Sequence, residues 1–527
     1  MVQQSATFSL AAWLPDLPRS LPSFEQGRLI GALPVHTCTN ALPGQFPGTF
    51  IPFKDFTPIS DQMDYVASLS FLATRGDGVR FQFIGTTAAI YLIENGTGVA
   101  NDVSKAGGYT GNVTTYWSFA QYGDRVIATN GIDDVQTFDL VLDVLFSDLP
   151  GNPPISKHVW TQGSFVFLGN LINDVDLGAA ASGYRNCGID DPTDWTSSTT
   201  TQCSAALLNG DGGEITGGCE ISSCGLIFQQ HNIWRVTYIG SPLIFDVKSF
   251  VRQVGAFPRS ILVLNESAYF WEDKGIFSCD GGSIGSISAR KIDSFIKADA
   301  ITTEMNISCA VDVNEEILYW AYQGGSGVLE EDDYDDTVVD FTRVLAYRVP
   351  TQEWTRINQE GSVLGVGLGI AYNLDTIDAL AELPAFGIDN FTTISFDNPI
   401  YNSTLPVVGC VNGLYWGTFT GNNKSVGLET KSIRLHPSLR SQVLNVRPII
   451  SSNTLYFDDK DVTVAIKSTR RPGDTPSALD GYSSDGDLQG WKAGRSSGIE
   501  HSFSLSVDFS FDQIIGIEVT YTPRGKR

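Results

Sequence analysis

From about Tyr65 onward, short runs of alternating apolar and polar residues are separated by Gly, Asp-Gly or Asn-Gly at intervals of about ten residues. Alternation with period two is typical of strands that bury one face, and the breaks are typical of tight turns. Long runs of Ala, Leu, Glu and Lys are scarce, so the pattern leaves little room for helices. The sequence therefore predicts an all-β protein.

The strands fall into rough repeats. Residues 260–284 read SILVLNESAYFWEDKGIFSCDGGSI, which predicts three strands joined by Asn265-Glu266 and by Asp273-Lys274-Gly275. Four further stretches of similar texture cover residues 78–93, 114–140, 158–195 and 215–250, and another unit, residues 307–357, contains ILYWAY, RVLAYR and EWTRI. Units of about 40 residues with four strands are typical of propeller blades, because radial stacking buries both faces of each small sheet.

The two ends of the chain differ from this middle part. Residues 1–60 contain eight of the prolines and little periodicity, which predicts an extended N-terminal arm that crosses other surfaces. After about Gly427, SFSLSVDFSF places Phe503, Leu505, Val507 and Phe509 on one face of a strand. We therefore expect an N-terminal arm (1–60), a β-propeller (61–426) and a C-terminal β-sandwich-like domain (427–527), with the basic tail Arg524, Lys526 and Arg527 contacting a neighbour or solvent.

Composition fits a packed globular chain of 527 residues, with 42% hydrophobic, 11% aromatic and only 18% charged residues. The net charge of −25 argues against a tight grip on nucleic-acid phosphates, which requires clustered Lys and Arg. The first residues lack the basic region and continuous apolar core of a signal peptide, and no window reaches the roughly 18 apolar residues of a membrane helix. We expect a soluble protein made in a cytoplasm, without membrane insertion.

Candidate chemistry is sparse. The eight cysteines have irregular spacing and are expected to be free buried thiols, and Cys219 and Cys224 lack the second half of a zinc site. The five histidines include no HExxH pair, and no nucleophile elbow or phosphate-binding glycine motif stands between a strand and a helix. We therefore expect neither an enzyme, a cofactor nor a metal. The acidic run Glu330, Glu331, Asp332, Asp333, Asp335 and Asp336 lacks the ligand spacing of a Ca²⁺ loop and is expected to be a solvated loop.

Two alternatives remain open at this point. Paired carboxylates of a glycosidase need not be neighbours in sequence, so a glycan-depolymerising or glycan-binding propeller is one of them. The aromatic residues Trp117, Trp160, Trp234, Trp271 and Trp320 would line its groove, although packing between sheets is the commoner use of such residues. A cellular scaffold propeller is the other, and cellular propellers usually show sharper repeats than this chain.

Several segments, in order, resemble a family of virion proteins from short-tailed bacteriophages, the tail nozzle or hub proteins, also called packaged-DNA stabilisation proteins. The resemblance covers residues 80–300 and runs through TTYWSFAQYGDRVIATNGIDDVQTFDL (114–140), DDPTDWT (190–196), NGDGGEITGG (209–218), CGLIFQQHNIWRVTYIGSPLIFDV (224–247) and VGAFPRSILVLNESAYFWEDKGIFSCDGGSI (254–284). No family motif is found in the first 60 residues.

The resemblance implies a propeller subunit in a ring, a homohexamer, attached below the portal and adaptor in the virion tail. The ring would line the DNA ejection channel, retain packaged DNA without reading its sequence, and dock tail fibres or spikes. An acidic wall would repel phosphates over about 8–10 Å at physiological salt. The acidic loop from Glu330 to Asp336 is accordingly our candidate channel or gate element.

Overall fold

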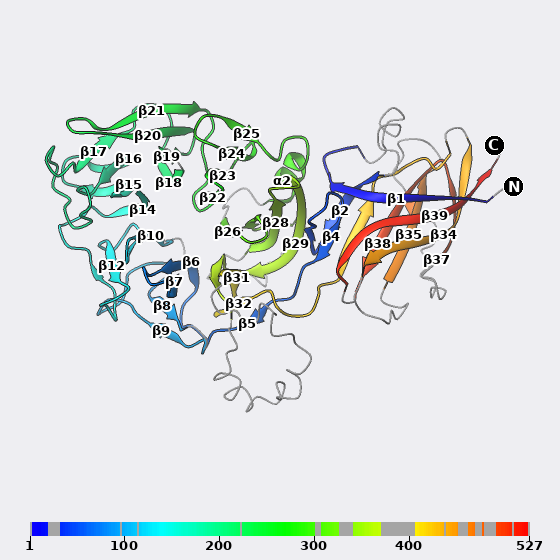
Figure 1. Cartoon of the computed structure of the whole chain (residues 1–527), viewed down its shortest axis with the longest axis horizontal. Helices are drawn as coiled ribbons and strands as arrows, with labels where there is room; N and C mark the ends of the chain where they lie inside the picture. Colours follow the sequence, from blue (N-terminus) through cyan, green and yellow to red (C-terminus); the bar gives the residue numbers. More distant parts are fainter. Residues whose placement is uncertain are drawn as a thin grey trace.

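The computed structural model describes residues 3–18, 32–94, 97–112, 115–221, 224–300, 307–325, 341–369, 406–436, 439–451, 462–469, 477–478, 492–508 and 511–524. Within these residues nearly all regular structure is β, and the single helix is α2 (Asp293–Asp299). Seven four-stranded sheets form a β-propeller, and an eleven-stranded sheet lies beside it (Figure 1). We call this eleven-stranded sheet the second sheet. The all-β prediction with a propeller is confirmed.

Six blades each come from one continuous stretch of chain. Their strands are β6 (Ala67–Thr74), β7 (Arg80–Thr86), β8 (Ile90–Ile93) and β9 (Ala100–Asp102); β10 (Ser118–Tyr122), β11 (Arg125–Thr129), β12 (Gln136–Asp139) and β13 (Ser147–Asp148); β14 (Ser156–Gln162), β15 (Phe165–Asp174), β16 (Gly178–Asn186) and β17 (Ser204–Leu207); β18 (Ile215–Ile221), β19 (Cys224–Gln229), β20 (Asn232–Gly240) and β21 (Ile244–Arg252); β22 (Leu262–Leu264), β23 (Ser267–Glu272), β24 (Gly275–Cys279) and β25 (Ile284–Ser286); β26 (Ser308–Asp312), β27 (Ile317–Tyr322), β28 (Phe341–Arg348) and β29 (Glu353–Gly361). These are the six repeats that the sequence predicts, and ILYWAY coincides with β27.

The seventh blade joins distant parts of the chain. It contains β30 (Val363–Leu368), β31 (Pro406–Asn412) and β32 (Tyr415–Thr418), and its outermost strand is β5 (Thr57–Pro58) from the N-terminal region. The first strands of neighbouring blades, such as β10 and β14 or β30 and β6, pack against each other, so they lie innermost around the propeller axis. Pairing of β5 with β32 completes the seventh blade, and packing of β30 against β6 closes the ring of blades.

The second sheet takes strands from both ends of the chain. They are β1 (Gln4–Trp13), β2 (Ala32–Thr39), β3 (Ala41–Pro43) and β4 (Phe50–Pro52), together with β33 (Val426–Thr430), β34 (Arg440–Ser451), β35 (Val462–Thr469), β36 (Ser477–Ala478), β37 (Lys492–Gly498), β38 (Glu500–Val507) and β39 (Gln513–Arg524). Strand β1 lies between β39 and β2, and Gln4 pairs with Tyr521. The described part of the N-terminal region therefore supplies strands to this sheet and to the seventh blade, which corrects the expectation of an extended arm.

The core of the second sheet follows the predicted alternation. Phe503, Leu505 and Val507 on β38 are buried together, whereas Phe509 lies outside the described residues. The buried His501 ring joins two more strands, because its Nε2 lies 2.8 Å from the hydroxyl of Ser441 on β34 and its Nδ1 lies 2.8 Å from the hydroxyl of Ser468 on β35. The C-terminal strands thus pack around a buried core, which is compatible with a further domain beside the propeller.

The propeller and the second sheet share one hydrophobic cluster that includes Trp13 and Leu33 of the sheet and Trp271 and Trp320 of the propeller. Polar contacts fix the same interface: both carboxylate oxygens of Asp16 accept hydrogen bonds of 2.9 Å from backbone N–H groups in the first turn of α2. The two units are joined through a packed interface rather than through a linker alone.

Candidate functional site

The predicted channel loop from Glu330 to Asp336 lies outside the described residues. Of the other predicted features, all eight cysteines are free, and six of them are buried. Trp117, Trp160, Trp271 and Trp320 are buried as the packing interpretation expects, and Trp234 is partly buried, with its indole N–H donating to Gln229. These aromatic residues therefore fill the spaces between blades and leave little ring surface for a glycan.

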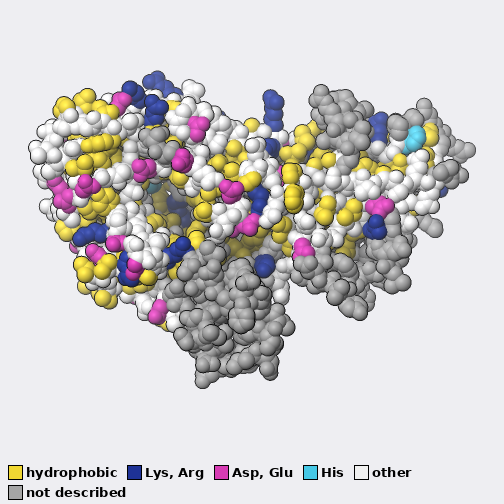
Figure 2. Space-filling model, viewed as in Figure 1, with side chains coloured by type: hydrophobic (Ala, Val, Ile, Leu, Met, Phe, Trp, Pro, Cys, Tyr) yellow, Lys and Arg dark blue, Asp and Glu magenta, His cyan; other side chains and the backbone are white. Residues whose placement is uncertain are grey.

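The structure brings together a polar cluster around the propeller axis that the sequence does not reveal. Four residues lie near the start of the innermost strand in four consecutive blades, so propeller closure gathers their side chains at one end of the axis: Tyr116, His158, Glu214 and Arg259. The Arg259 guanidinium lies over the Tyr116 ring, 5.6 Å from its centroid, and the Tyr116 and His158 rings are 6.0 Å apart. A space-filling view shows the propeller hollowed at its centre (Figure 2).

The carboxylate of Glu214 in this axial cluster is paired locally. Lys157 Nζ lies 3.1 Å from Glu214 Oε2, and the same oxygen accepts a hydrogen bond of 2.9 Å from the Asn170 amide. Burial raises the pKa of Glu214, but these two hydrogen bonds outweigh burial and leave the pKa below its usual value. Glu214 is consequently ionised at neutral pH.

Burial controls the two rings of the cluster. It lowers the pKa of His158 to about 4, an effect that the nearby charge of Lys157 reinforces, and it raises the pKa of Tyr116 to about 12. Both rings are therefore neutral at pH 7. A neutral buried histidine packed against a tyrosine ring is suited to holding blades together, and this cluster presents no nucleophile beside a base.

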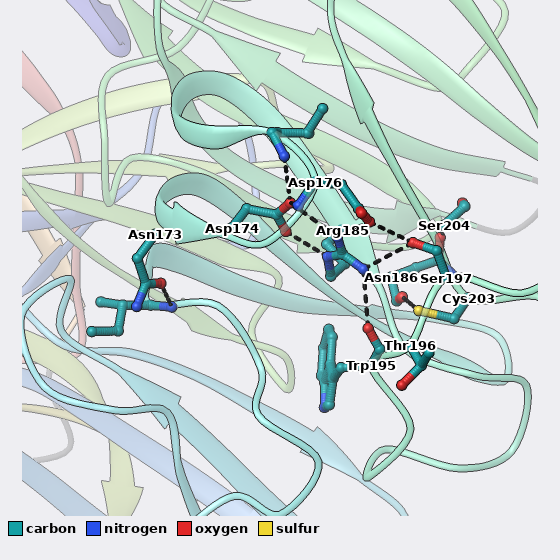
Figure 3. Close-up of polar contacts among 12 residues, drawn as sticks. Asn173, Asp174, Asp176, Arg185, Asn186, Trp195, Thr196, Ser197, Cys203 and Ser204 are labelled. Atoms are coloured by element: carbon teal, nitrogen blue, oxygen red, sulfur yellow. Dashed lines mark hydrogen bonds and ion pairs between the residues drawn. The ribbon is translucent and has the colours of Figure 1, made fainter.

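A second polar network fixes the outer part of the β14–β17 blade (Figure 3). Arg185 and Asp174 are enclosed, with side-chain exposures of 1% and 0%, and the Arg185 Nη2 to Asp174 Oδ1 distance is 2.9 Å. The same guanidinium also donates to Asp176, to the Ser197 hydroxyl and to the backbone carbonyl of Trp195.

Asp174 is further satisfied by two backbone N–H groups, those of residues 176 and 177, each at 2.9 Å. Burial raises the pKa of Asp174, yet these hydrogen bonds and those from Arg185 lower it overall. The network thus ties the segment DDPTDWT, which carries part of the family resemblance, to the blade. Its role is to hold the loop, since every charge in it already has a partner inside the protein.

A run of four exposed apolar residues occupies the loop between β12 and β13. Val141, Leu142, Val144 and Leu145 have 59%, 78%, 79% and 47% of their surface exposed. Yet the loop is firmly held: Asp139 Oδ1 accepts the N–H groups of Val141 and Leu142 at 3.0 and 3.2 Å. Its neighbours anchor both ends, because the Leu140 N–H donates to the Asp124 carbonyl at 2.8 Å and the Phe146 N–H donates to the Val103 carbonyl at 2.8 Å.

Apolar side chains exposed to water on a loop whose backbone is held by hydrogen bonds are typical of surfaces that bind other proteins. We call residues 141–145 the rim loop. Figure 2 shows hydrophobic side chains gathered along the outer left rim of the propeller.

A pocket of about 270 Å³ lies between the β14–β17 and β18–β21 blades, and its lining includes Phe165, Tyr238 and Phe245. A single carboxylate, Glu220, lines it, and Glu220 accepts a hydrogen bond of 3.0 Å from the Gly163 N–H. Glycoside hydrolysis requires two carboxyl groups about 5–9.5 Å apart, and the lining of this pocket supplies one.

Among the described residues, no group of three or more His, Cys, Asp or Glu side chains is placed to hold a metal ion. No helix in the part of the chain that the structure describes is long and apolar enough to cross a membrane.

Comparisons with known proteins assign no family to this chain. The sequence matches no protein-family model and no curated protein. Solved structures that are similar include the extracellular domain of BT4673 from B. thetaiotaomicron, at 10% identity and a TM-score of 0.41, covering 76% of this chain and 44% of that one. YCF48 bound to a D1 peptide has 10% identity and a TM-score of 0.36 over 58% of this chain and 86% of that chain. AztD from Citrobacter koseri has 11% identity and a TM-score of 0.30, covering 60% and 94%.

Proposed function

We propose that this chain is a structural virion protein of a short-tailed bacteriophage, a tail nozzle or hub subunit that sits below the portal and adaptor. In this role, copies of the chain form a ring, a homohexamer, in the virion tail. The ring lines the DNA ejection channel, retains packaged DNA and docks fibres or spikes. Ordered sequence resemblance over residues 80–300 supports this role, and so does a propeller joined to a second sheet.

The observation that carries the proposal is the rim loop. Leu142 and Val144 are more than three-quarters exposed, although backbone hydrogen bonds to Asp139 already hold the loop in shape. Burial of such side chains against another protein releases about 25 cal/mol per Å² of apolar surface, with little ordering of the loop left to be done. Such an apolar surface suits a subunit that binds other proteins in an assembly.

The axis of the propeller itself is not the DNA path in this proposal. Side chains of Tyr116, His158 and Arg259 occupy one end of it. The lumen for DNA would lie between subunits of the ring. Acidic side chains facing that lumen, with those of Glu330–Asp336 as the first candidates, would keep phosphates from adhering.

The proposal is tested by imaging the particle and by changing the rim loop. Leu142→Asp combined with Val144→Asp should abolish incorporation of the chain into particles while leaving the purified chain folded. Val313→Asp is the matched control, because Val313 is also an exposed apolar residue, at 59%, in a different turn. Particle images with no ring of this chain on the portal axis would refute the proposal, and normal incorporation of the double variant would remove the rim loop from it.

The competing function is a tail-associated propeller that binds or depolymerises host glycans. The pocket beside Tyr238 and Phe245 is the feature that favours it, since aromatic rings next to a cleft suit sugars. Incubation of the purified protein with host capsule or lipopolysaccharide, followed by measurement of new reducing ends, decides the enzymatic form. Sustained release would favour this function over the structural one.

A further inference from the structure

Two cysteines lie directly after β16 and directly before β17, at the base of the loop that joins these strands. Asn186 and Ser204 form the last paired rung of these strands. The next residues outward are Cys187 and Cys203, and beyond them the Ile189 N–H donates to the Thr201 carbonyl at 2.8 Å. The sum of residue numbers is the same for all three pairs, so the antiparallel register continues and places Cys187 directly opposite Cys203.

The backbone groups of both cysteines point away from the partner strand. The Cys187 N–H donates to the Val166 carbonyl of β15 at 2.9 Å, and the Cys203 carbonyl accepts the Ser198 N–H within the loop at 3.0 Å. Cys187 and Cys203 therefore form a non-hydrogen-bonded pair, in which opposite Cα atoms lie about 4.5 Å apart. This separation falls inside the range of about 4.4–6.8 Å over which a disulfide bridges two Cα atoms.

From this geometry we propose that Cys187 and Cys203 form a disulfide when the protein meets a disulfide oxidant, and that the bond locks the loop 188–202 onto the blade. One cysteine thiolate attacks the oxidant R–S–S–R, which expels one R–SH and leaves a mixed disulfide between that cysteine and R–S. The other cysteine then displaces the second R–SH, so that two protein thiols and R–S–S–R give one protein disulfide and two R–SH. The inference is independent of the proposed function.

The surroundings explain why both thiols are free here and why the bond, once formed, would persist. Cys187 and Cys203 are 0% and 2% exposed. Burial raises the pKa of Cys187 to about 12 and that of Cys203 to about 11, so few thiolates are present at neutral pH. Oxidation therefore waits for the loop to open, and the same burial protects the disulfide from reductants afterwards.

The locked loop is connected to the rest of the propeller. It contains Trp195, which is buried against the blade, and Gln202, whose side-chain carbonyl accepts a hydrogen bond of 2.7 Å from Tyr238 in the next blade. A reducing cytoplasm keeps such thiols reduced, whereas oxidising surroundings outside the cell favour the disulfide bond. The disulfide would stiffen this edge of the propeller wherever the protein meets an oxidant.

Peptide mapping of the full chain tests the proposal. The protein is held in oxidised glutathione, free thiols are alkylated without reduction, and digestion includes chymotrypsin, which cleaves after Trp195 and so separates Cys187 from Cys203. The expected result is a peptide pair that stays joined, carries no alkyl group on either cysteine, and separates on reduction. Cys38→Ser, which removes another buried thiol, should leave the joined pair intact, whereas Cys187→Ser should abolish it.

Two results would overturn the proposal. One is that wild-type protein under oxidised glutathione yields no joined pair, or joins Cys187 or Cys203 only to Cys219, Cys224 or Cys279. The other concerns the locking role: amide hydrogen exchange across residues 188–202 should slow at least about tenfold on oxidation, and unchanged exchange in protein shown to carry the bond would refute it. Both measurements use wild-type protein, so a variant that fails to fold does not affect the outcome.

Discussion

Removing the positive charge of Arg185 is the sharpest test of how the outer blade is held. In Arg185→Met the methionine keeps much of the side-chain volume, but Asp174, whose side chain is fully enclosed, loses its ionic partner. Asp174 keeps only two backbone N–H groups, those of residues 176 and 177. Breaking a buried pair by removing one partner costs about 3–5 kcal/mol, a large share of the roughly 5–15 kcal/mol by which most domains are stable.

Urea unfolding followed by tryptophan fluorescence measures this loss, and hydrogen exchange localises it, because the loop residues 187–204 should exchange first. Lys248→Met is the matched control: Lys248 and Asp246 form an exposed pair, with side-chain exposures of 65% and 37%, so the change should stay within about 0.5 kcal/mol. Asp174→Asn added to Arg185→Met should recover part of the stability by removing the unpaired charge. If Arg185→Met loses no more stability than Lys248→Met, the reasoning fails.

Three further outcomes follow from the same structure. Burial lowers the pKa of His158 and of His501 to about 4, against about 6.5 in the unfolded chain. Their contribution to the free energy of unfolding is therefore complete above pH 6.5 and is lost as the pH falls through about 4, by roughly 3 kcal/mol each. Unfolding titrations from pH 7 to 4 should show this loss of stability, and a flat profile would contradict it. Asp16→Ala removes the acceptor of two N–H groups in the first turn of α2 and should cost about 1 kcal/mol, with faster hydrogen exchange confined to the interface between the propeller and the second sheet. Gly367→Ala would place a Cβ 2.3 Å from a glutamine amide and 2.4 Å from an indole ring, and should cost about 1–3 kcal/mol in thermal or urea unfolding, whereas Gly285→Ala, which meets nothing within 4 Å, should be nearly neutral.

The propeller was predictable because the sequence signals for each blade, its turn residues and its apolar alternation, lie within one short stretch of chain. In residues 260–284, turn residues and apolar alternation fall on β22, β23 and β24, and Asn265 and Glu266 adopt the positive φ values of 49° and 60° that a tight hairpin turn requires. The six predicted repeats likewise match six blades, since each blade is built from one continuous stretch of chain.

The seventh blade and the N-terminal strands were not predictable from such local signals. Strand β5 pairs with β32 about 360 residues later, and β1 pairs with β39 at the other end of the chain. The prolines that predicted an arm are accommodated at strand ends and on short strands: Pro43 and Pro52 end β3 and β4, and Pro58 ends β5. A proline-rich sequence with distant partners looks unstructured when it is read alone.

The polar sites show the same limit. Lys157 and Glu214 are 57 residues apart, and only closure of the propeller brings their charged atoms within 3.1 Å. The prediction of a channel loop from Glu330 to Asp336, by contrast, rests on the local density of acidic residues. The described residues do not include this loop. The sequence spacing of Cys187 and Cys203 does not by itself indicate that they lie opposite each other. The register of the strands that precede and follow the loop is the signal that could have shown it.

The way the chain is threaded bears directly on a structural role. It starts in the second sheet, enters the propeller at β5, completes seven blades and returns to the second sheet at β33, so that both ends lie together far from the propeller (Figure 1). Each unit is closed by a strand from the distant end of the chain, and the hydrophobic cluster around Trp13 and Trp271 continues from one into the other. Rotation between the units would have to open that cluster and break the contacts of Asp16 with α2. A partner at the rim loop and another at the far edge of the second sheet would therefore be held at a fixed separation, as the role proposed above in a tail wall would require.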